Sequence, residues 1–277
     1  MNLSRRTAAP ACAPLLLLVA ASVLLPFTWR SSGLLWQCLQ GSECAAQELV
    51  ADPYYAKALW NTVWISAAST LIGGTIGLGA AVALAEMPRW RGLVSVLAGL
   101  GSNFSGVPLA VALTLLFGAQ GVLTVVFAQG GLALPFDLYR NSGLLLAYVC
   151  FQAPLACLLL MAPVQMLETG LLEAAATLGA GPLLFWRRVG LPVLLPSLIE
   201  TGSLLFANAA AAYATPFALT GTGANVLAVR VAALVSGDIF AQPELSSLLA
   251  VIMFAMLVAV IAASRWLAAR LRAGAGA

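Results

Sequence analysis

The chain of 277 residues is 62% hydrophobic and only 8% charged, with a formal net charge of +3. A soluble globular domain carries roughly a quarter charged residues, so this composition excludes an ordinary soluble fold. The sequence contains no histidine and no glycine-rich phosphate loop that ends in Lys-Ser or Lys-Thr. We therefore expect no metal centre, no bound cofactor and no enzymatic activity, ATP hydrolysis included, in this chain.

Long uncharged stretches predict an all-α membrane protein, because about 20 apolar residues cross the hydrocarbon core of a bilayer. In chain order, six spans are expected near 11–29, 60–85, 93–117, 143–166, 194–216 and 245–264. The first begins after Arg5-Arg6, as in a twin-arginine signal, but no small-residue cleavage site follows, so we expect an uncleaved helix. Val122–Phe136 is short and interrupted by two glycines, and is expected to be an interfacial or re-entrant segment.

The basic residues predict how these spans are oriented. With the N-terminus in the cytoplasm, nine of the 13 basic residues fall on the cytoplasmic side: Arg5, Arg6, Arg89, Arg91, Arg187, Arg188, Arg265, Arg270 and Arg272. Four fall on the outer side: Arg30, Lys57, Arg140 and Arg230. This bias follows the positive-inside rule. We expect a multi-pass protein of a bacterial cytoplasmic (inner) membrane with both termini in the cytoplasm.

Two further features leave alternatives open. The second span carries Gly73, Gly77, Ala81 and Ala85 at every fourth position, a spacing that lets helices approach closely in lipid; the partner helix belongs either to this chain or to another subunit. Cys38 and Cys44 share the outer loop, where an oxidising compartment permits a disulfide. The sequence does not decide between a disulfide and two free thiols.

The segment 168–192 interrupts the apolar runs between the fourth and fifth spans. An Ala-rich stretch with high helix propensity is followed by Gly179, Gly181 and Pro182, which are expected to end it. A second short segment, "LLFWRRV", offers Phe185 and Trp186 as apolar anchors of the kind that dominate interface energies. The segment is predicted either to dock a partner protein or to lie on the membrane surface as an amphipathic helix.

The same segment resembles a loop of a known family. It reads Glu173-Ala174-Ala175, three residues, Gly179, nine residues, Val189, one residue and Leu191-Pro192. This is similar to the cytoplasmic loop of the membrane permeases of binding-protein-dependent ABC importers, with Val189 in place of the usual Ile. "YATPFALTG", "GSNFSGVPLA" and "FGAQGVLT" are similar to segments of permeases for polyamines, ferric iron and related small solutes.

The resemblance implies a single permease domain over 1–277, with a coupling helix in the loop 168–192. In the family this helix sits in a cleft of a separate ATPase subunit, so ATP is expected on a partner. The expected coupling residues are Glu173, Ala174, Ala175, Gly179, Val189, Leu191 and Pro192. Other expected partners are a second permease subunit (a sister or a second copy), a periplasmic binding protein that sets most of the selectivity, and the bilayer; no nucleic-acid partner is expected.

Polar residues inside the predicted spans are candidates for the translocation path: Asn103, Ser105, Gln152, Glu200 and Asn208. Interhelical hydrogen bonds are the alternative role for the uncharged ones. Glu200 is expected either near the inner interface, snorkelling or paired with Arg187 or Arg188, or at the exit of the path. The competing function is a secondary carrier driven by an ion gradient, which the single intramembrane carboxylate and the lack of a visible repeat disfavour.

Overall fold

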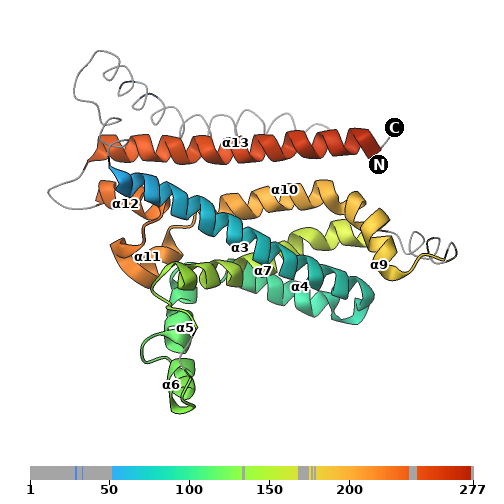
Figure 1. The fold of residues 1–277 in the computed structure, drawn as a ribbon, viewed down its shortest axis with the longest axis horizontal. Coiled ribbons are helices and arrows are strands. Elements are labelled where there is room, and N and C mark those ends of the chain that lie inside the picture. The colour runs from blue at the N-terminus through green and yellow to red at the C-terminus, as the bar shows by residue number, and fades with distance from the viewer. Residues whose placement is uncertain are drawn as a thin grey trace, which may run out of the picture. The chain divides into compact units, whose positions relative to one another are not determined.

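The computed structural model describes residues 52–132, 135–167, 179–236 and 242–275, with the single positions Trp29, Gly33, Ala175 and Thr177. Within these ranges every regular element is a helix, which confirms the predicted all-α fold. The predicted first span lies outside the described residues except for Trp29, and the Cys38–Cys44 loop is also outside them. The helices are α3 (Pro53–Glu86), α4 (Pro88–Asn103), α5 (Val107–Phe117), α6 (Val122–Gln129), α7 (Asn141–Gln165), α9 (Pro182–Phe185), the π-helical turn η1 (Trp186–Gly190), α10 (Leu191–Ala210), α11 (Ala214–Thr220), the 3₁₀ turn η2 (Gly221–Gly223), α12 (Leu227–Ser236) and α13 (Pro243–Ala275) (Figure 1).

Five helical stretches in the described chain are long and apolar enough to cross a membrane: Pro53–Glu86, Val107–Gln129, Asn141–Gln165, Trp186–Ala210 and Glu244–Ala273. A bent pair of helices, Ala214–Gly223 and Leu227–Ser236, is a sixth candidate. The chain divides into two compact units, and the larger one holds Lys57–Val229 and Met256–Ala277. The contacts on which the functional argument rests all lie within this larger unit.

The predicted third span, 93–117, is broken into two helices. α4 ends at Asn103, and Gly106 then takes φ +75°, a left-handed conformation that favours glycine. The Gly106 N–H donates to Thr215 Oγ1 of α11 at 2.8 Å. A contact with a segment more than 100 residues away therefore holds the break, and the uncharged run by itself gave no sign of it.

The predicted interfacial segment Val122–Phe136 contains α6. Together α5 and α6 make the stretch Val107–Gln129, which has the length and hydropathy of a span. In Figure 1 the two helices lead away from α4 and α7. The interfacial or re-entrant placement of this segment stays a prediction.

The predicted fifth span, 194–216, starts and ends earlier than expected: the helical stretch runs from Trp186 to Ala210, and a new helix, α11, begins at Ala214. Pro216 has no N–H, so it cannot donate to the carbonyl of Ala212 as a helical residue would. The Tyr148 hydroxyl donates to that carbonyl instead, at 3.4 Å. A side chain of α7 thus replaces the missing backbone donor where the helix is interrupted.

The small residues of α3 pack against α7, which confirms the interpretation that their partner helix belongs to this chain. A Cβ atom on Gly77 would lie 2.4 Å from Ala156 Cβ and 2.7 Å from the Cys157 nitrogen, and one on Gly73 would lie 3.0 Å from Gln152 Cβ. Real Cβ atoms do not approach backbone so closely, and the two helix backbones are in contact only because these side chains are missing.

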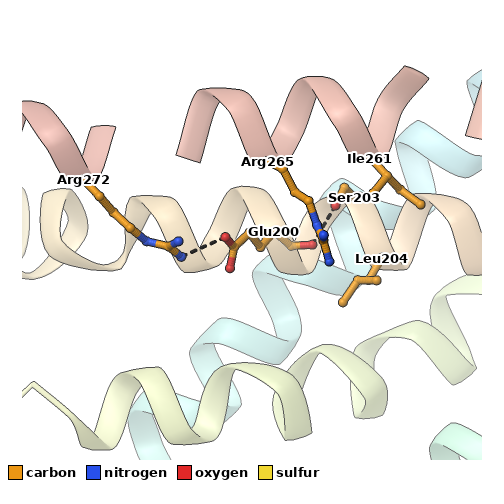
Figure 2. Close-up of a pocket in the computed structure, with 6 residues that line it drawn as sticks. All are labelled: Glu200, Ser203, Leu204, Ile261, Arg265 and Arg272. Carbon is orange, nitrogen blue, oxygen red and sulfur yellow. Dashed lines mark hydrogen bonds and ion pairs between the residues drawn. The ribbon is translucent and has the colours of Figure 1, made fainter. Parts of the chain in front are cut away.

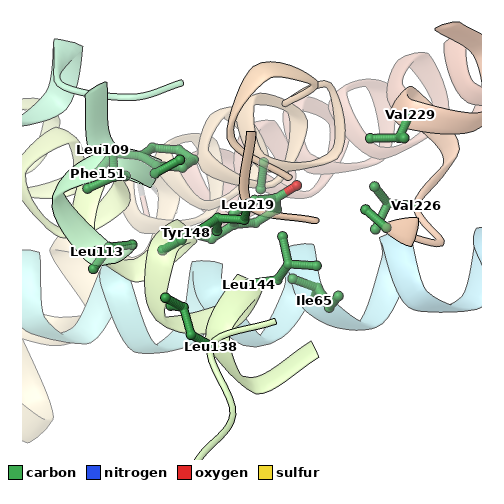
Figure 3. Packing of buried hydrophobic residues seen from close by; sticks show 14 residues of the cluster. Ile65, Leu109, Leu113, Leu138, Leu144, Tyr148, Phe151, Leu219, Val226 and Val229 are labelled. Carbon is green, nitrogen blue, oxygen red and sulfur yellow. The ribbon is translucent and has the colours of Figure 1, made fainter. Parts of the chain in front are cut away.

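Two apolar clusters hold the larger unit together at opposite ends of its helices. The first combines Ile65 of α3 with Leu144, Tyr148 and Phe151 of α7 and Leu219 of α11 (Figure 3). The second combines Ala81 of α3, Leu160 and Val164 of α7 and Leu194 of α10. We call these the first and second clusters. Along the chain, α3 and α7 both run from the first cluster to the second. Because α10 starts in the second cluster, at Leu194, and continues toward the first, it runs antiparallel to them.

The turn between α3 and α4 is fixed beside the second cluster by Arg91. Its Nε donates to the Leu84 carbonyl at 2.8 Å, and its terminal guanidinium nitrogen donates to the Ala85 carbonyl. Carbonyls in the last turn of a helix have no donor within the helix, and a cation there also complements the helix dipole. Arg91 therefore closes α3 and starts α4 in the reverse direction.

Candidate functional site

The Ala-rich part of the predicted coupling loop ends in a defined turn. Ala175 and Thr177 are helical, Gly179 has φ +77°, and the Ala180 N–H donates to the Ala175 carbonyl at 2.9 Å. A bond that spans five residues past a left-handed glycine is the Schellman pattern that ends helices. The stop expected at Gly179 is therefore present. Glu173 and Ala174 lie outside the described residues.

The second part of the loop is not a separate helix but runs directly into the membrane helix. α9, η1 and α10 follow one another without a break, and Val189 lies in the π-helical turn. The Leu191 N–H donates to the Trp186 carbonyl, five residues back. Pro192 explains this wider turn, because its ring would collide with the carbonyl of Arg188 in a regular α-helix.

The two aromatic residues of the loop are used inside the chain. Phe185 is only 4% exposed, and Trp186 packs against the second cluster with its ring over Gly190, where an added Cβ would lie 2.7 Å from the indole. The interpretation of Phe185 as a docking anchor is therefore wrong, and Trp186 serves mainly to attach the loop to the bundle. The side chains presented outward are Leu184, Arg187, Arg188, Leu191 and Pro192.

Of the predicted path residues, Gln152 lies deepest. It is fully buried on α7, and its Nε2 donates to Ser69 Oγ of α3 at 3.0 Å. Its Oε1 and the neighbouring Ser66 Oγ are buried without a hydrogen-bond partner among the described residues. The interhelical hydrogen bond that the sequence offered as the alternative role is present at this position.

The other uncharged candidates lie on the surface of the chain. The Asn103 side chain donates to the carbonyl of Gly99 on its own helix at 2.8 Å. Ser105 lies in the break between α4 and α5, and Asn208 lies near the end of α10; both are exposed. All three remain available to contact a solute or a second subunit, whereas Gln152 is not available in this structure.

Glu200 lies on α10 and forms an ion pair with Arg272 of α13, with Arg272 Nη2 2.8 Å from Glu200 Oε1 (Figure 2). The expected pairing with Arg187 or Arg188 is therefore replaced by one with Arg272. The pair borders a cavity of about 390 Å³ lined by Glu200, Ser203, Leu204, Ile261, Arg265 and Arg272. Since both charged side chains are partly exposed, the pair contributes little to stability.

Sequence reasoning missed a polar junction at the end of the bundle beside the first cluster. Asn61 Nδ2 donates to the Asn225 carbonyl at 3.1 Å, and the Leu227 N–H donates to Thr62 Oγ1 at 2.8 Å. These bonds satisfy the non-helical backbone between η2 and α12, as membrane proteins require of buried irregular segments. The one sequence signal is the polar pair Asn61-Thr62 near the start of the predicted second span.

The segments with the subfamily resemblance also meet in space. "GSNFSGVPLA" contributes Gly106, and "YATPFALTG" contributes Thr215, its hydrogen-bond partner. The first segment contains the start of α5 and the second contains α11, and these two helices pack against each other. Residues that looked like two unrelated short matches therefore form one structural unit.

Comparison with known proteins gives a consistent result, although no protein-family model matches the chain. The probable ABC transporter permease protein y4fN of Sinorhizobium fredii is 30% identical over 229 residues, which is 82% of this chain and 40% of that protein. The chain thus spans about two fifths of the length of this relative.

Relatives closer in length match as well. The putative 2-aminoethylphosphonate transport system permease PhnU of Salmonella choleraesuis is 28% identical over 231 residues, 79% of this chain and 80% of that protein. The spermidine/putrescine transport system permease PotB of Haemophilus influenzae is 29% identical over 157 residues, 56% of this chain and 54% of that protein.

Solved structures share the fold. A chain of a bacterial alginate ABC transporter, crystallised with an alginate-bound periplasmic protein, superimposes with a TM-score of 0.70 at 15% identity and covers 98% of each chain. A chain of the MetNI methionine ABC transporter gives a TM-score of 0.60 at 19% identity, over 78% of this chain and 95% of that one. With curated relatives and solved structures in agreement, this chain is a homologue of the ABC transporter permeases and has the fold of ABC importer transmembrane subunits.

Proposed function

We propose that the chain is the permease subunit of an ATP-driven importer, in which a separate ATPase subunit supplies energy and a periplasmic binding protein delivers a small solute. The observation that carries the proposal is the loop before α10. A helix that ends at the left-handed Gly179 is followed by a segment that continues without a break from Pro182 to Ala210. A partner that moves this loop therefore moves a membrane helix.

The attachment of the loop supports this mechanical role. Trp186 packs on the second cluster, which joins the ends of α3 and α7 to the start of α10. Force applied at the loop is thus carried by three helices together. We place Glu173, Ala174 and Ala175 in the ATPase cleft, with Gly179 setting the exit angle of the coupling helix. Val189, Leu191 and Pro192 form the connection to α10.

The proposal also includes the partner subunits and the location of the chain. The chain spans the bacterial inner membrane with the loop and both termini in the cytoplasm, and it lines a path together with a second permease domain, from a sister chain or a second copy. ATP binds to the partner ATPase. Alternating access follows when closure of the ATPases swings the coupling helices and reorients the spans.

For the solute, we propose a polyamine, ferric iron or a similar small solute. The support is the PotB relative, together with the contact between the two segments that resemble polyamine-type permeases. The PhnU relative adds 2-aminoethylphosphonate to the solutes worth testing.

The test is uptake by proteoliposomes that contain the chain with the ATPase and binding protein encoded beside it. Spermidine, putrescine, ferric iron and 2-aminoethylphosphonate are supplied in turn. We expect accumulation that requires ATP and the binding protein and that persists with a proton ionophore. Glu173→Lys should abolish uptake and weaken recovery of the ATPase, whereas Glu86→Lys, an exposed carboxylate at the end of α3, should not. Uptake that needs no ATP and collapses with the proton gradient would indicate a secondary carrier.

A further inference from the structure

The cavity between α10 and α13 is lined by an arginine side chain that forms no ion pair with the rest of the described chain. Arg265 lines it, and within the described residues the structure gives Arg265 neither an ion pair nor a hydrogen bond. Figure 2 shows its side chain extending from α13 toward α10, near Ser203 and Leu204. With Glu200 and Arg272 neutralising each other, the cavity carries a net charge of about one positive unit.

The depth of this cation follows from α13 itself. The residues Leu245–Ser264 are uncharged over 20 positions, which at about 1.5 Å per residue matches a hydrocarbon core of about 30 Å. Arg265 is therefore at the boundary between acyl chains and headgroups, and Arg272 lies about 10 Å further along the axis. The exposed Trp266, with the Arg270 guanidinium 3.9 Å over its ring, suits the same interfacial layer.

The cavity is also graded from polar to apolar along this direction. Glu200 and Arg272 pair at its headgroup end. Leu204 lies about one turn beyond Glu200 along α10, and Ile261 lies about one turn before Arg265 along α13, both in the direction of the hydrocarbon layer. A molecule that fills it needs an anionic group at the level of Arg265 and an apolar chain beyond that level. A phospholipid has both in this order.

We propose that this cavity binds the phosphate of an anionic phospholipid, with Arg265 as its principal ligand and the acyl chain along Leu204 and Ile261. The Glu200–Arg272 ion pair flanks the site and limits its affinity, because the carboxylate repels the phosphate and occupies the second arginine. Basic pockets between membrane helices bind lipid headgroups in this manner. A lipid bound there contacts the middle of α10, the helix that continues from the coupling loop, so lipid composition can affect the position of that helix.

The experiment is a native mass spectrometry titration of the purified full chain, together with whatever subunits copurify, with phosphatidylglycerol. Arg265→Gln should lower the apparent affinity about tenfold or more, as expected for the loss of a charge-assisted hydrogen bond. Arg270→Gln is the matched control, since it removes the same charge from the same helix but does not line the cavity. Equal phosphatidylglycerol binding by these two variants overturns the proposal.

Glu200→Gln gives an independent result of opposite sign. It frees Arg272 and removes a negative charge, so phosphatidylglycerol should bind more tightly than to the wild type; unchanged or weaker binding contradicts the assigned role of the ion pair. This variant also keeps the proposal testable if Arg265→Gln fails to fold.

Two further ligands identify the source of the phosphate. Phosphatidylcholine, whose phosphate is neutralised by its own choline, should bind more weakly than phosphatidylglycerol, and equal binding overturns the charge-based assignment. Inorganic phosphate at millimolar concentration should not displace phosphatidylglycerol, and displacement would assign the site to a free anion. Lipid binding is measured without transport, so a failure here is distinguishable from a failure of the proposed import function.

Discussion

Among single residues, Gly77 sets the closest approach between two membrane helices. Its missing Cβ lets α3 meet the backbone of α7 at Ala156 and Cys157. The four-residue spacing of small side chains predicted a close helix contact, but the spacing alone did not name the partner, because a lipid-facing helix of another subunit presents the same pattern. Only the three-dimensional arrangement assigns it to α7.

Gly77→Ala should therefore destabilise the chain, since the new methyl group cannot be accommodated without separating two backbones. Overpacking of this kind costs about 1–3 kcal/mol. Thermal unfolding in detergent, followed by tryptophan fluorescence, should show a lower midpoint. Gly79→Ala on the same helix has no atom within 4 Å of the added Cβ and should leave the midpoint unchanged or slightly raised, as helix propensity predicts. Equal midpoints for the two variants would contradict the α3–α7 contact.

The Ser69–Gln152 hydrogen bond makes a second, asymmetric prediction. Ser69→Ala leaves the Gln152 amide buried with neither of its polar atoms paired, which costs about 1–3 kcal/mol. Gln152→Met removes the buried amide altogether and should cost less, because an interhelical hydrogen bond in a membrane is worth only about 0.6 kcal/mol on average. Ser95→Ala, an exposed serine that bonds its own helix, is the control. A reversed order of stability between the first two variants would show that Gln152 has a further partner.

For whole elements, continuity was harder to predict than existence. The apolar runs correctly predicted helices where α3, α7 and α13 lie, because a long uncharged run has the length and composition of a membrane helix. The break at Gly106 and the interruption before Pro216 depend instead on Thr215 and on the Tyr148 hydroxyl, which are distant in sequence. The π-helical turn could be predicted in part. Pro192 predicts that the helix is irregular there, but the packing of Trp186 over Gly190 decides which form the irregularity takes.

The end of the proposed coupling helix gives a prediction for an element. Gly179→Val places a β-branched residue at φ +77°, a conformation that such residues adopt only under strain. The helix should then end differently, and ATP hydrolysis by the assembled transporter should lose its dependence on the loaded binding protein. Gly181→Val is the control, because its φ is not left-handed and an added Cβ there has no neighbour within 4 Å. Membrane insertion of both variants, measured by immunoblot, should match the wild type; normal coupling in Gly179→Val would exclude the proposed role of this turn.

On the scale of the whole molecule, most arginines of the larger unit lie at one end. Arg91 closes α3 beside the second cluster, Arg187 and Arg188 follow Trp186 of the same cluster, and Arg272 pairs with Glu200 on α10. These residues come from three separate regions of the sequence. The charge count predicted this grouping because the positive-inside rule acts on the topology as a whole, whereas the identity of each contact needed the fold.

The final prediction concerns topology, and it separates six spans from a count that includes both α4 and Val107–Gln129. Single cysteines are introduced at Lys57, Arg89, Asp137 and Arg188 in a chain whose native cysteines are replaced by serine or alanine. With six spans and a cytoplasmic N-terminus, a membrane-impermeant maleimide added to spheroplasts should label Lys57→Cys and Asp137→Cys, while Arg89→Cys and Arg188→Cys should react only after permeabilisation. If both α4 and Val107–Gln129 crossed the membrane, Arg89 and Asp137 would react from the same side. Labelling of Arg188→Cys from outside would place the coupling loop away from any cytoplasmic ATPase and would exclude the proposed import mechanism.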